Sequence, residues 1–495
     1  MSSPKQVTAI FDIGKTNKKF LLFDEKYAVI EKHQTELEES TDDDGDSCED
    51  LAKLTDWIKD QISEANKRYD IQAMNFSAYG ASLVHLDKNG EPVTDLYNYL
   101  KNYPDELLSE FYESAGGKET FSLQTASPPM GMLNSGLQLY WLKHRKPGLF
   151  SSIETSLHFP NYLSYLFTGR KVSELTSIGC HTGLWDFDKM NYHQWVDREE
   201  VRNLLPSPKA ISEFSVNDQD IKVGPGIHDS SAALAPYLMG MNDSFLLVST
   251  GTWSITLNPF NDEPLTYEEL ERDCLCYLDI YGNQVKASRF FLGAEYSHQK
   301  KKIEDFFGES VDENSSAFDV ALMKETIKNR KSGQGLDLEK AYSSGPFPQE
   351  KQGDWQLDQF SSAKEAYNQL VLDLVYIQSE SIKLAEGNNK IGKLIVTGGF
   401  SQNVLFLSLL ATFFEDKEIY TSSLPNASAL GAALVVNEES VIRNEVEQSH
   451  VSKLESHLGQ TSPDKSRDLD DIKKLLDLKL VKPLGNLNLE NYSWV

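Results

Sequence analysis

Residues 7–23 read VTAIFDIGKTNKKFLLF and carry the clearest indication of the fold. An apolar run at 7–11 predicts a buried strand, and 18–23 predicts a strand that returns beside it after the turn at 12–17. The same pattern recurs at residues 245–257, FLLVSTGTWSITL. This repeat predicts an α/β fold of two similar lobes, each of which contributes one turn to a shared cleft.

The rest of the chain alternates expected strands with expected helices, which supports the α/β class. We expect a first domain at 1–240, a second at 241–440, and a C-terminal tail at 441–495 that docks on the body. The polar segment 299–356 predicts a surface insertion or a mobile lobe. Further expected strands are 74–77, 83–86 and 391–396, and the expected helices are 51–62, 137–143, 162–167, 230–238, 362–386 and 427–436.

The composition limits the partners of the protein. The chain of 495 residues has 40% hydrophobic and 25% charged residues, as soluble globular proteins do, and a formal net charge of −27. A surface this acidic repels the phosphates of nucleic acids and anionic lipids, so neither partner is expected. Four scattered cysteines are too few for a disulfide framework, and no run approaches the roughly 18 apolar residues of a membrane span. We therefore expect a cytoplasmic protein with reduced thiols, as a monomer or a homodimer.

The densest charge run is residues 36–50, which hold nine acids. A calcium-binding loop with Gly45 at its sixth position would need carboxylates at its first and twelfth positions. Ser40 and Leu51 stand there. A calcium loop is therefore excluded, and a solvated loop is expected.

The triplet Gly14-Lys15-Thr16 first suggests a nucleotide-binding P-loop. That motif needs glycine where Ala9 stands, and it must open a helix, whereas residues 19–23 have the pattern of a strand. The P-loop is therefore excluded. The turn fits a phosphate-binding hairpin better, because backbone N–H groups of a glycine turn cradle phosphate oxygens without a helix.

Polar residues around this turn suit a polyphosphate. Thr16 and Asn17 supply hydroxyl and amide donors, and Lys19 supplies charge. Asp12, at the end of the strand, is a hard-oxygen candidate for holding Mg²⁺ through water. A plain hairpin with a surface aspartate is the alternative. Three lysines form a local basic spot on this acidic chain, where a nucleotide could bind: Lys15, Lys18 and Lys19.

Two further turns are candidates for nucleotide contacts. Gly251 and Thr252 repeat the first turn at the equivalent place in the second lobe, so the two turns could hold a triphosphate from opposite sides. Gly398, Gly399 and Asn403 follow an expected strand and precede a helix, where glycines let the backbone approach a flat ligand. A pair of plain hairpins and a simple strand-to-helix turn are the alternatives.

The segment 224–229, GPGIHD, carries the candidate for catalysis. A dinucleotide fingerprint would need a third glycine where Asp229 stands, so it is excluded. The helix dipole favours a carboxylate at the start of a helix, so Asp229 could be a simple N-cap. Alternatively, Asp229 is a general base that accepts a hydroxyl proton during phosphoryl transfer. Both readings stay open on the residues alone, and His228 is expected to be a packed or hydrogen-bonded neighbour.

In this order, these segments resemble the FGGY carbohydrate kinases, members of the sugar kinase/Hsp70/actin superfamily. Residues 12–19 look like the first phosphate motif of the family, with lysine at 15 and 19 in place of threonine and arginine. The resemblance covers most of the chain. Residues 173–188 are similar to the middle signature of the family, and residues 226–229 to the segment of the catalytic aspartate. Residues 250–252 are similar to the second phosphate motif, and residues 397–403 with 427–433 to the adenosine motif and its helix.

The resemblance implies two actin-like, ribonuclease H-like lobes that close on ATP–Mg²⁺ and a small sugar. It implies that Asp229 accepts the proton of the attacking sugar hydroxyl and that Asp12 positions Mg²⁺. It assigns these residues to phosphates and nucleotide: Gly14, Thr16, Asn17, Lys19, Gly251, Thr252, Gly398, Gly399 and Asn403. It assigns these to the sugar pocket: Ser82, Asn98, His228 and Asp229.

The sugar itself is read from local context. Residues 97–102 lack the Trp-x-Asp-x-Arg-like element that many members carry there. The contexts of residues 228–230 and 250–253 are similar to the rhamnulokinase and fuculokinase branch, which implies a ketose or deoxyketose of rhamnulose, fuculose or xylulose type in sugar catabolism. Two non-catalytic functions are the alternatives: actin-like ATP-dependent assembly, and a sugar-responsive regulator.

Overall fold

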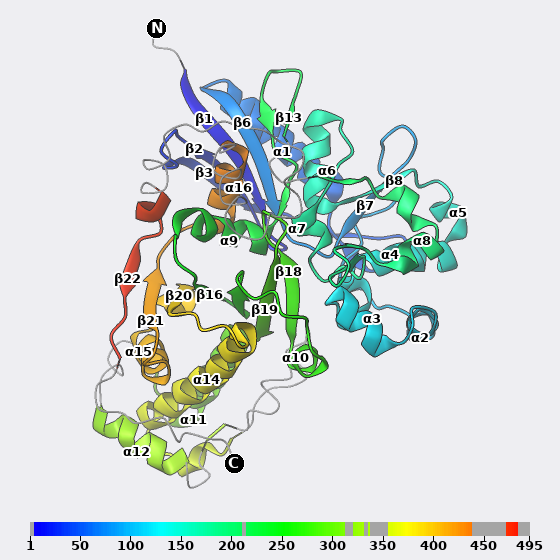
Figure 1. The fold of residues 1–495 in the computed structure, drawn as a ribbon. Helices are drawn as coiled ribbons and strands as arrows, with labels where there is room; N and C mark the ends of the chain where they lie inside the picture. The colour runs from blue at the N-terminus through cyan, green and yellow to red at the C-terminus, as the bar shows by residue number, and fades with distance from the viewer. Residues whose placement is uncertain are drawn as a thin grey trace. The chain divides into compact units, whose positions relative to one another are not determined.

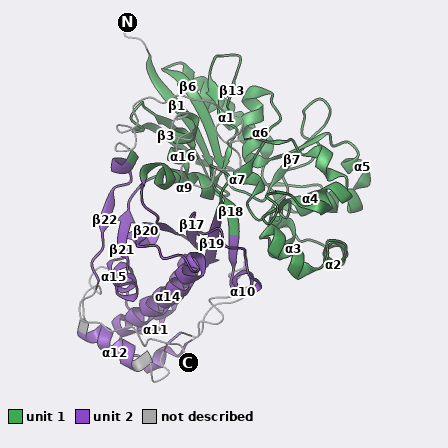
Figure 2. Ribbon diagram, in the orientation of Figure 1, with its two compact units in different colours: residues 1–240, 276–284, 425–472 green, residues 241–275, 285–424, 473–495 purple. Residues whose placement is uncertain are grey.

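The computed structural model (Figure 1) describes residues 4–209, 214–311, 320–330, 335–336, 355–437 and 472–483. The chain divides into two compact units (Figure 2). Unit 1 comprises the described residues within 1–240, 276–284 and 425–472, and unit 2 comprises those within 241–275, 285–424 and 473–495. The domain boundaries expected from the sequence, 1–240, 241–440 and 441–495, stay predictions.

Unit 1 is built on a mixed sheet with the strand order β13-β14-β6-β1-β2-β3 (Figure 1). β1 runs antiparallel to β2 and parallel to β6, and the short strand β15 also runs parallel to β6. The strands of this sheet are β1 (Lys5–Ile13), β2 (Asn17–Phe23), β3 (Val29–Glu36), β6 (Tyr69–Ala78), β13 (Ser215–Val216), β14 (Lys222–Val223) and β15 (Ile227–His228). Smaller two-stranded sheets pair β4 (Ser40–Thr41) with β5 (Ser47–Cys48), β7 (Leu83–Leu86) with β8 (Thr155–His158), β9 (Ser173–Glu174) with β12 (Pro208–Lys209), and β10 (Trp185–Asp186) with β11 (Asn191–Tyr192).

Helix α1 illustrates why the helices of unit 1 form. Its buried residues Leu54, Ile58 and Ile62 recur every four positions and so share one face. At its start, Asp50 accepts a hydrogen bond from the backbone N–H of Lys53. The helices of unit 1 are α1 (Leu51–Asn66), α2 (Asp105–Ser114), α3 (Lys118–Thr125), α4 (Gly136–Arg145), α5 (Pro147–Phe150), α6 (Phe159–Thr168), α7 (Leu175–Ile178), α8 (Gln194–Arg198), α9 (Asp229–Gly240) and α16 (Ala427–Asn437).

Helices α9 and α16 pack against each other although they are far apart in the sequence (Figure 1). Gly431 makes this close approach possible, because a Cβ atom there would lie 1.8 Å from the carbonyl oxygen of Ala232. α16 also contacts β1 and β6, and the side chain of Asn75 donates to the carbonyl of Ala432 at 3.1 Å. The start of α16 is therefore held near the end of β1.

Unit 2 is built on a second mixed sheet with the order β18-β19-β17-β16-β20-β21-β22. β16 runs antiparallel to β17 and parallel to β20, and residues 276–284, where β18 turns into β19, belong to unit 1. The strands are β16 (Leu246–Thr250), β17 (Ser254–Asn258), β18 (Cys274–Leu278), β19 (Gln284–Phe290), β20 (Lys393–Gly398), β21 (Glu418–Ser422) and β22 (Leu478–Leu480). The helices are α10 (Tyr267–Glu271), α11 (Leu292–Phe307), α12 (Val320–Arg330), α14 (Ala363–Glu386) and α15 (Val404–Phe413).

The two sheets share one topology. The strands β3-β2-β1-β6 of unit 1 correspond in order and direction to β19-β17-β16-β20 of unit 2. The strand–turn–strand repeat predicted at 7–23 and 245–257 is therefore confirmed, and so is the α/β class with two similar lobes.

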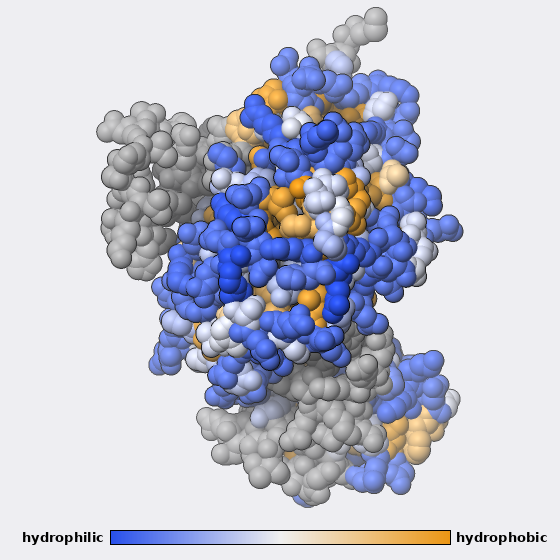
Figure 3. Space-filling view, turned by 90° about the vertical axis from the view of Figure 1, so that its right-hand side faces the viewer, coloured by the Kyte–Doolittle hydropathy of each residue, from blue (hydrophilic) through white to orange (hydrophobic). Residues whose placement is uncertain are grey.

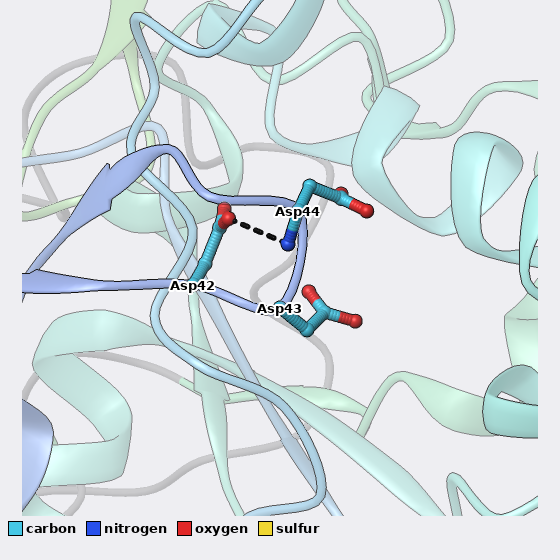
Figure 4. A group of neighbouring side chains, drawn as sticks. All are labelled: Asp42, Asp43 and Asp44. Carbon is cyan, nitrogen blue, oxygen red and sulfur yellow. Dashed lines mark hydrogen bonds between the residues drawn. The ribbon is translucent and has the colours of Figure 1, made fainter.

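Most acids of the densest acidic run are exposed, as expected for a solvated segment, but Asp42 and Glu49 are buried. The run forms the β4–β5 hairpin, whose turn carries Asp42, Asp43 and Asp44 (Figure 4). Nζ of Lys101 lies 2.6 Å from a carboxylate oxygen of Asp42, which has a fully buried side chain, and Nζ of Lys146 lies 2.6 Å from Asp43. Lysine ammonium groups therefore neutralise this group of carboxylates.

Within the described part of the chain, no helix is long and apolar enough to cross a membrane. Among the described residues that Figure 3 draws, most are hydrophilic, and the apolar ones gather in small patches.

Candidate active site

Two aspartates from distant parts of the sequence come to one edge of the unit 1 sheet. Asp12 on β1 lies opposite Ser77 of β6, and Ile227 of β15 lies opposite the same Ser77. Because β1 and β15 both run parallel to β6, their carboxyl ends reach the same edge. Asp229, the first residue of α9, follows β15 there. Ligand sites of open α/β sheets lie at this edge.

The carboxylate of Asp12 is held by two side chains. Lys19 lies opposite it on β2, with Nζ 3.0 Å from Oδ2. Ser428, at the start of α16, donates its hydroxyl to Oδ1 at 2.9 Å. Asp12 is only 6% exposed. Both of its oxygens are therefore bonded, and the side chain is fixed in one orientation.

The prediction that three lysines form an exposed basic spot is wrong for Lys18, which is buried. The side chain of Lys18 is 1% exposed and lies 2.8 Å from Glu49. Lys15 and Lys19 keep some exposure, and each also has a carboxylate partner, which for Lys15 is Glu39. The positive charge of all three lysines is therefore compensated within unit 1.

The turn between β1 and β2 brings the predicted phosphate residues together. The backbone N–H of Gly14 donates to the carbonyl of Asn17 at 3.0 Å, which closes the turn. Thr16 is exposed at its tip. The side chain of Asn17 accepts a hydrogen bond from Gln34 at 2.6 Å, and this bond restricts its amide. Gly14, Thr16 and Asn17 thus form one short turn, and their contact with phosphate stays a prediction.

The carboxylate of Asp229 lies beside a buried imidazole. Nε2 of His228 is 3.3 Å from Oδ1 of Asp229 and 3.1 Å from Sγ of Cys180. Burial lowers the pKa of His228, although the charge of Asp229 opposes this, and the ring is neutral near pH 7. Within the described residues, Nδ1 of His228 has no hydrogen-bond partner. The hydrogen bond to Oδ1 of Asp229 comes from the hydroxyl of Ser230 at 3.2 Å, and the neutral imidazole of His228 lies beside the same oxygen.

The surroundings of Asp229 make it a better proton acceptor than an ordinary aspartate. Burial among protein atoms raises its pKa; His228 opposes the rise, and the negative charge of Asp12 adds to it. Water still reaches 37% of the side chain, which limits the increase. Asp229 is therefore more basic than an ordinary aspartate, and its side chain is accessible to a small molecule.

The two segments predicted to line a sugar pocket lie in unit 1. Ser82 is buried, and its carbonyl accepts a hydrogen bond from the N–H of Phe159 at 3.1 Å. Asn98 is partly exposed, and its side chain accepts a bond from a backbone N–H two residues further on. Burial and then the charge of Asp229 raise the pKa of the neighbouring Tyr99, so this segment lies within electrostatic reach of Asp229. Sugar contacts of Ser82 and Asn98 stay predictions.

Unit 2 contains a cavity of about 650 Å³. Four residues predicted to contact the nucleotide line it: Gly251, Thr252, Gly399 and Asn403. Its other lining residues are Gly293, Ala294, Tyr296, Ser297, Phe400 and Gln402. Gly398, which was also predicted, is not a lining residue. It packs against the chain behind the turn, where a Cβ atom would lie 1.8 Å from the carbonyl oxygen of Thr250.

Hydrogen bonds join three separate segments into one wall of this cavity. The carbonyl of Thr252, in the turn between β16 and β17, accepts bonds from the N–H groups of Gly293 at 3.1 Å and Ala294 at 3.2 Å. The hydroxyl of Thr250 accepts a bond from the N–H of Phe400 at 3.0 Å. The second turn is therefore fixed to the start of α11 and to the Gly-Gly segment after β20.

Sequence reasoning missed the start of α11 as part of this cavity. The signal was the run FFLG at 290–293, in which a glycine stands where a strand passes into a helix. One turn further on, the hydroxyl of Tyr296 lies 3.2 Å from that of Tyr367, to which Asn403 donates its side-chain amide at 3.1 Å. Asn403 is thereby tied to the helices on both sides of the cavity.

Two known proteins are similar to this chain in sequence. A rhamnulokinase from Oceanobacillus iheyensis is 25% identical over 222 residues, which are 42% of this chain and 46% of that protein. The match thus spans about half the length of this relative. A gluconokinase from Bacillus subtilis is 20% identical over 465 residues, which are 86% of each chain.

Solved structures and family models extend the comparison to nearly the whole chain. A carbohydrate kinase from Novosphingobium aromaticivorans superimposes with a TM-score of 0.77 at 21% identity, covering 99% of this chain and 97% of that chain, which shows the shared fold. Two family models match: the N-terminal domain of the FGGY family of carbohydrate kinases over residues 7–198, and the C-terminal domain of the carbohydrate kinase FGGY over 242–444. With both domains matched in order, the chain belongs to the FGGY family of carbohydrate kinases.

Proposed function

We propose that this protein is an ATP-dependent carbohydrate kinase, which transfers the γ-phosphate of ATP to a hydroxyl group of a small sugar. The observation that carries the proposal is the placement of Asp12 and Asp229 at one edge of the unit 1 sheet, with an accessible and unusually basic Asp229. Phosphoryl transfer needs a proton acceptor for the attacking hydroxyl and a separate group for the charge of the phosphates. The two aspartates divide these tasks.

In the proposed reaction, Asp229 is the catalytic base. As the sugar oxygen attacks the γ-phosphorus, its proton passes to a carboxylate oxygen of Asp229, the bond to the β-phosphate oxygen breaks, and ADP leaves. The hydroxyl of Ser230 donates to Oδ1 of Asp229 at 3.2 Å and helps to orient the carboxylate, beside which the imidazole of His228 packs. His228 opposes the rise in the pKa of Asp229, but burial outweighs it, so the carboxylate is more basic than that of an ordinary aspartate.

The residues around Asp12 fit a magnesium-bound polyphosphate. Carboxylate oxygen is a preferred ligand of Mg²⁺, which keeps several of its waters and neutralises phosphate charge when it is bound. Asp12 would hold the ion through water. Lys19, whose Nζ lies 3.0 Å from Oδ2 of Asp12, would remain beside the phosphates. Ser428 would keep the second oxygen of Asp12 in place.

The unit 2 cavity fits a nucleotide in size and in lining. A volume of about 650 Å³ lies in the range of pockets that bind small molecules. Gly251, Thr252 and Gly399 leave backbone exposed to phosphate and ribose, and Asn403 offers an amide to the base. Gly398 would support the wall of this cavity. In unit 1, the turn of Gly14, Thr16 and Asn17 is a separate candidate for phosphate contacts.

For the sugar, we propose a ketose or deoxyketose of rhamnulose, fuculose or xylulose type. The rhamnulokinase relative and the sequence context of His228 and Asp229 support this class. Ser82, Asn98 and His228 would line the sugar pocket beside the base. The gluconokinase relative makes an open-chain acid the main competitor.

A coupled ADP-release assay tests the proposal. The purified protein is offered Mg-ATP with L-rhamnulose, L-fuculose, D-xylulose, D-gluconate and glycerol, each against a reaction without sugar. We expect one ketose to raise ADP release about 100-fold or more over the sugar-free rate, since sugar kinases discriminate through contacts to individual hydroxyls. A protein that binds Mg-ATP and releases no ADP above background with any sugar would contradict the proposal.

A further inference from the structure

Lys18 is a charged side chain in the interior of unit 1. It lies on β2 with 1% of its side chain exposed, and its three N–H donors face three acceptors. Two are the carboxylate oxygens of Glu49, at 2.8 and 3.1 Å. The third is the carbonyl of Lys15 in the turn predicted to bind phosphate, at 2.8 Å. One buried ammonium group therefore ties this turn to the segment just ahead of α1.

Glu49 passes the connection on to a tyrosine. The hydroxyl of Tyr79 donates to a carboxylate oxygen of Glu49 at 3.2 Å. Burial, and then the charge of Glu49, raise the pKa of Tyr79 well above its ordinary value, so the phenol remains a donor. The backbone N–H of Tyr79 also donates to the carbonyl of Ile13 at 3.2 Å, at the residue between Asp12 and the turn.

Tyr79 stands at the head of the segment that carries Ser82, and its ring also reaches the second sugar segment. The ring centroid lies 6.0 Å from that of Tyr99 in an edge-to-face contact, and 5.0 Å from that of Phe159. The series Lys18, Glu49, Tyr79 thus connects the phosphate turn with both segments proposed to line the sugar pocket, entirely within unit 1.

A requirement for stability does not explain this ion pair. Removing two charges from water costs several kcal/mol for each ion, and well-packed apolar residues of similar volume often stabilise a core as much or more. Unit 2 contains a pair of the same design, in which Lys417 donates to Glu386 at 2.6 Å and to the carbonyl of Ile391 at 2.9 Å. That pair joins none of the proposed ligand segments, which makes it a suitable control.

We propose that Lys18, Glu49 and Tyr79 are positioning residues that couple the nucleotide site to the sugar site, an inference that rests on the proposed function. Phosphate bound at the turn of Gly14 to Asn17 shifts the carbonyl of Lys15, one of the three acceptors of Lys18. Loss of a hydrogen-bond partner is strongly unfavourable for a buried ammonium group. The ammonium group of Lys18 therefore moves together with Glu49, and Glu49 shifts the hydroxyl of Tyr79. Nucleotide binding thereby orders the sugar segments before the sugar arrives.

The test measures hydrogen exchange of the backbone amides of residues 79–82 and 97–99 with and without saturating Mg-ADP. Two variants interrupt the network. Lys18→Met with Glu49→Met replaces the pair by apolar side chains, and Tyr79→Phe removes a single hydroxyl and leaves the ring packing intact. The controls are Lys417→Met with Glu386→Met, and Tyr165→Phe, whose hydroxyl bonds the carbonyl of Gly90 at 3.1 Å.

In the wild type and in both controls, we expect Mg-ADP to slow exchange of these amides about ten-fold, a typical strength of coupling between sites. In both network variants we expect less than about two-fold slowing, with the affinity for Mg-ADP within about three-fold of the wild type, because no proposed nucleotide contact is removed. Tyr79→Phe keeps the test informative if the double variant does not fold.

The outcomes separate this inference from the proposed function. If Mg-ADP binds and both network variants show wild-type slowing, the coupling role is refuted and the kinase proposal stands. If the wild type binds no Mg-ADP, the proposed function fails and takes this inference with it.

Discussion

The role of α11 in the proposed nucleotide cavity can be tested at one glycine. A Cβ atom at Gly293 would lie 2.1 Å from the carbonyl oxygen of Gly251. Real Cβ atoms essentially never come closer than 3.0 Å to another heavy atom. In Gly293→Ala, the start of α11 and the turn after β16 must therefore separate by about 0.9 Å. The change adds one methyl group and no charge.

This separation breaks the wall of the cavity. The N–H groups of Gly293 and Ala294 lie 3.1 and 3.2 Å from the carbonyl of Thr252, so a shift of this size takes both to about 4 Å, beyond hydrogen-bonding distance. Each bond is worth about 0.5–1.5 kcal/mol, and nucleotide binding must restore the wall at a cost of about 1–3 kcal/mol. At about 1.4 kcal/mol for each factor of ten, affinity for Mg-ADP falls about 5- to 140-fold.

Isothermal titration with Mg-ADP measures this effect, with urea unfolding of the same preparations as a check of folding. The matched control is Gly392→Ala, because a Cβ atom at Gly392 has no neighbour within 4 Å and the residue is not part of the cavity. We expect the control to bind as the wild type does. Folded Gly293→Ala protein with an affinity within about two-fold of the wild type would refute the assignment of α11 to the nucleotide site.

Three further predictions follow from the contacts in unit 1. The value of kcat/KM falls as the pH is lowered through the raised pKa of Asp229, because the protonated carboxyl group cannot accept a proton. A pH–rate profile that stays flat to below pH 4 would contradict this prediction. Asp12→Asn raises the Mg²⁺ concentration needed for half-maximal rate, measured by Mg²⁺ titration at fixed ATP, and an unchanged requirement would remove Asp12 as a metal ligand. Lys101→Met leaves the buried carboxylate of Asp42 without its cation and lowers the free energy of unfolding by about 3–5 kcal/mol in urea; a loss below about 0.5 kcal/mol would show that the pair contributes little.

The two-lobed α/β fold could be predicted from the sequence because its information is local. Residues 7–23 and 245–257 each carry strand, turn and returning strand in one continuous stretch, and the structure pairs them as expected. Asp229 could be identified in the same way, since a carboxylate after a glycine-rich bend and ahead of a helix is readable from a few neighbours.

Contacts between distant residues could not be predicted. The burial of Asp42 within the otherwise exposed acidic run could not be foreseen, because its cation, Lys101, lies 59 positions away in the sequence. Ser428, which bonds Asp12, lies 416 positions away. Gly293 lines the cavity, but its one signal in the sequence is a glycine where a strand passes into a helix, which does not by itself indicate a cavity.

The central claim is that Asp229 is the base of a phosphoryl transfer, and Asp229→Asn tests it most directly. The substitution keeps the size of the side chain and removes its capacity to accept a proton. Single-turnover phosphorylation of the sugar is measured beside the affinity for Mg-ATP, with Asp70→Asn, an exposed aspartate on β6, as control. We predict that phosphoryl transfer falls about 10²- to 10⁴-fold while Mg-ATP affinity and the control stay as in the wild type. Transfer by Asp229→Asn within about ten-fold of the wild type would contradict the account.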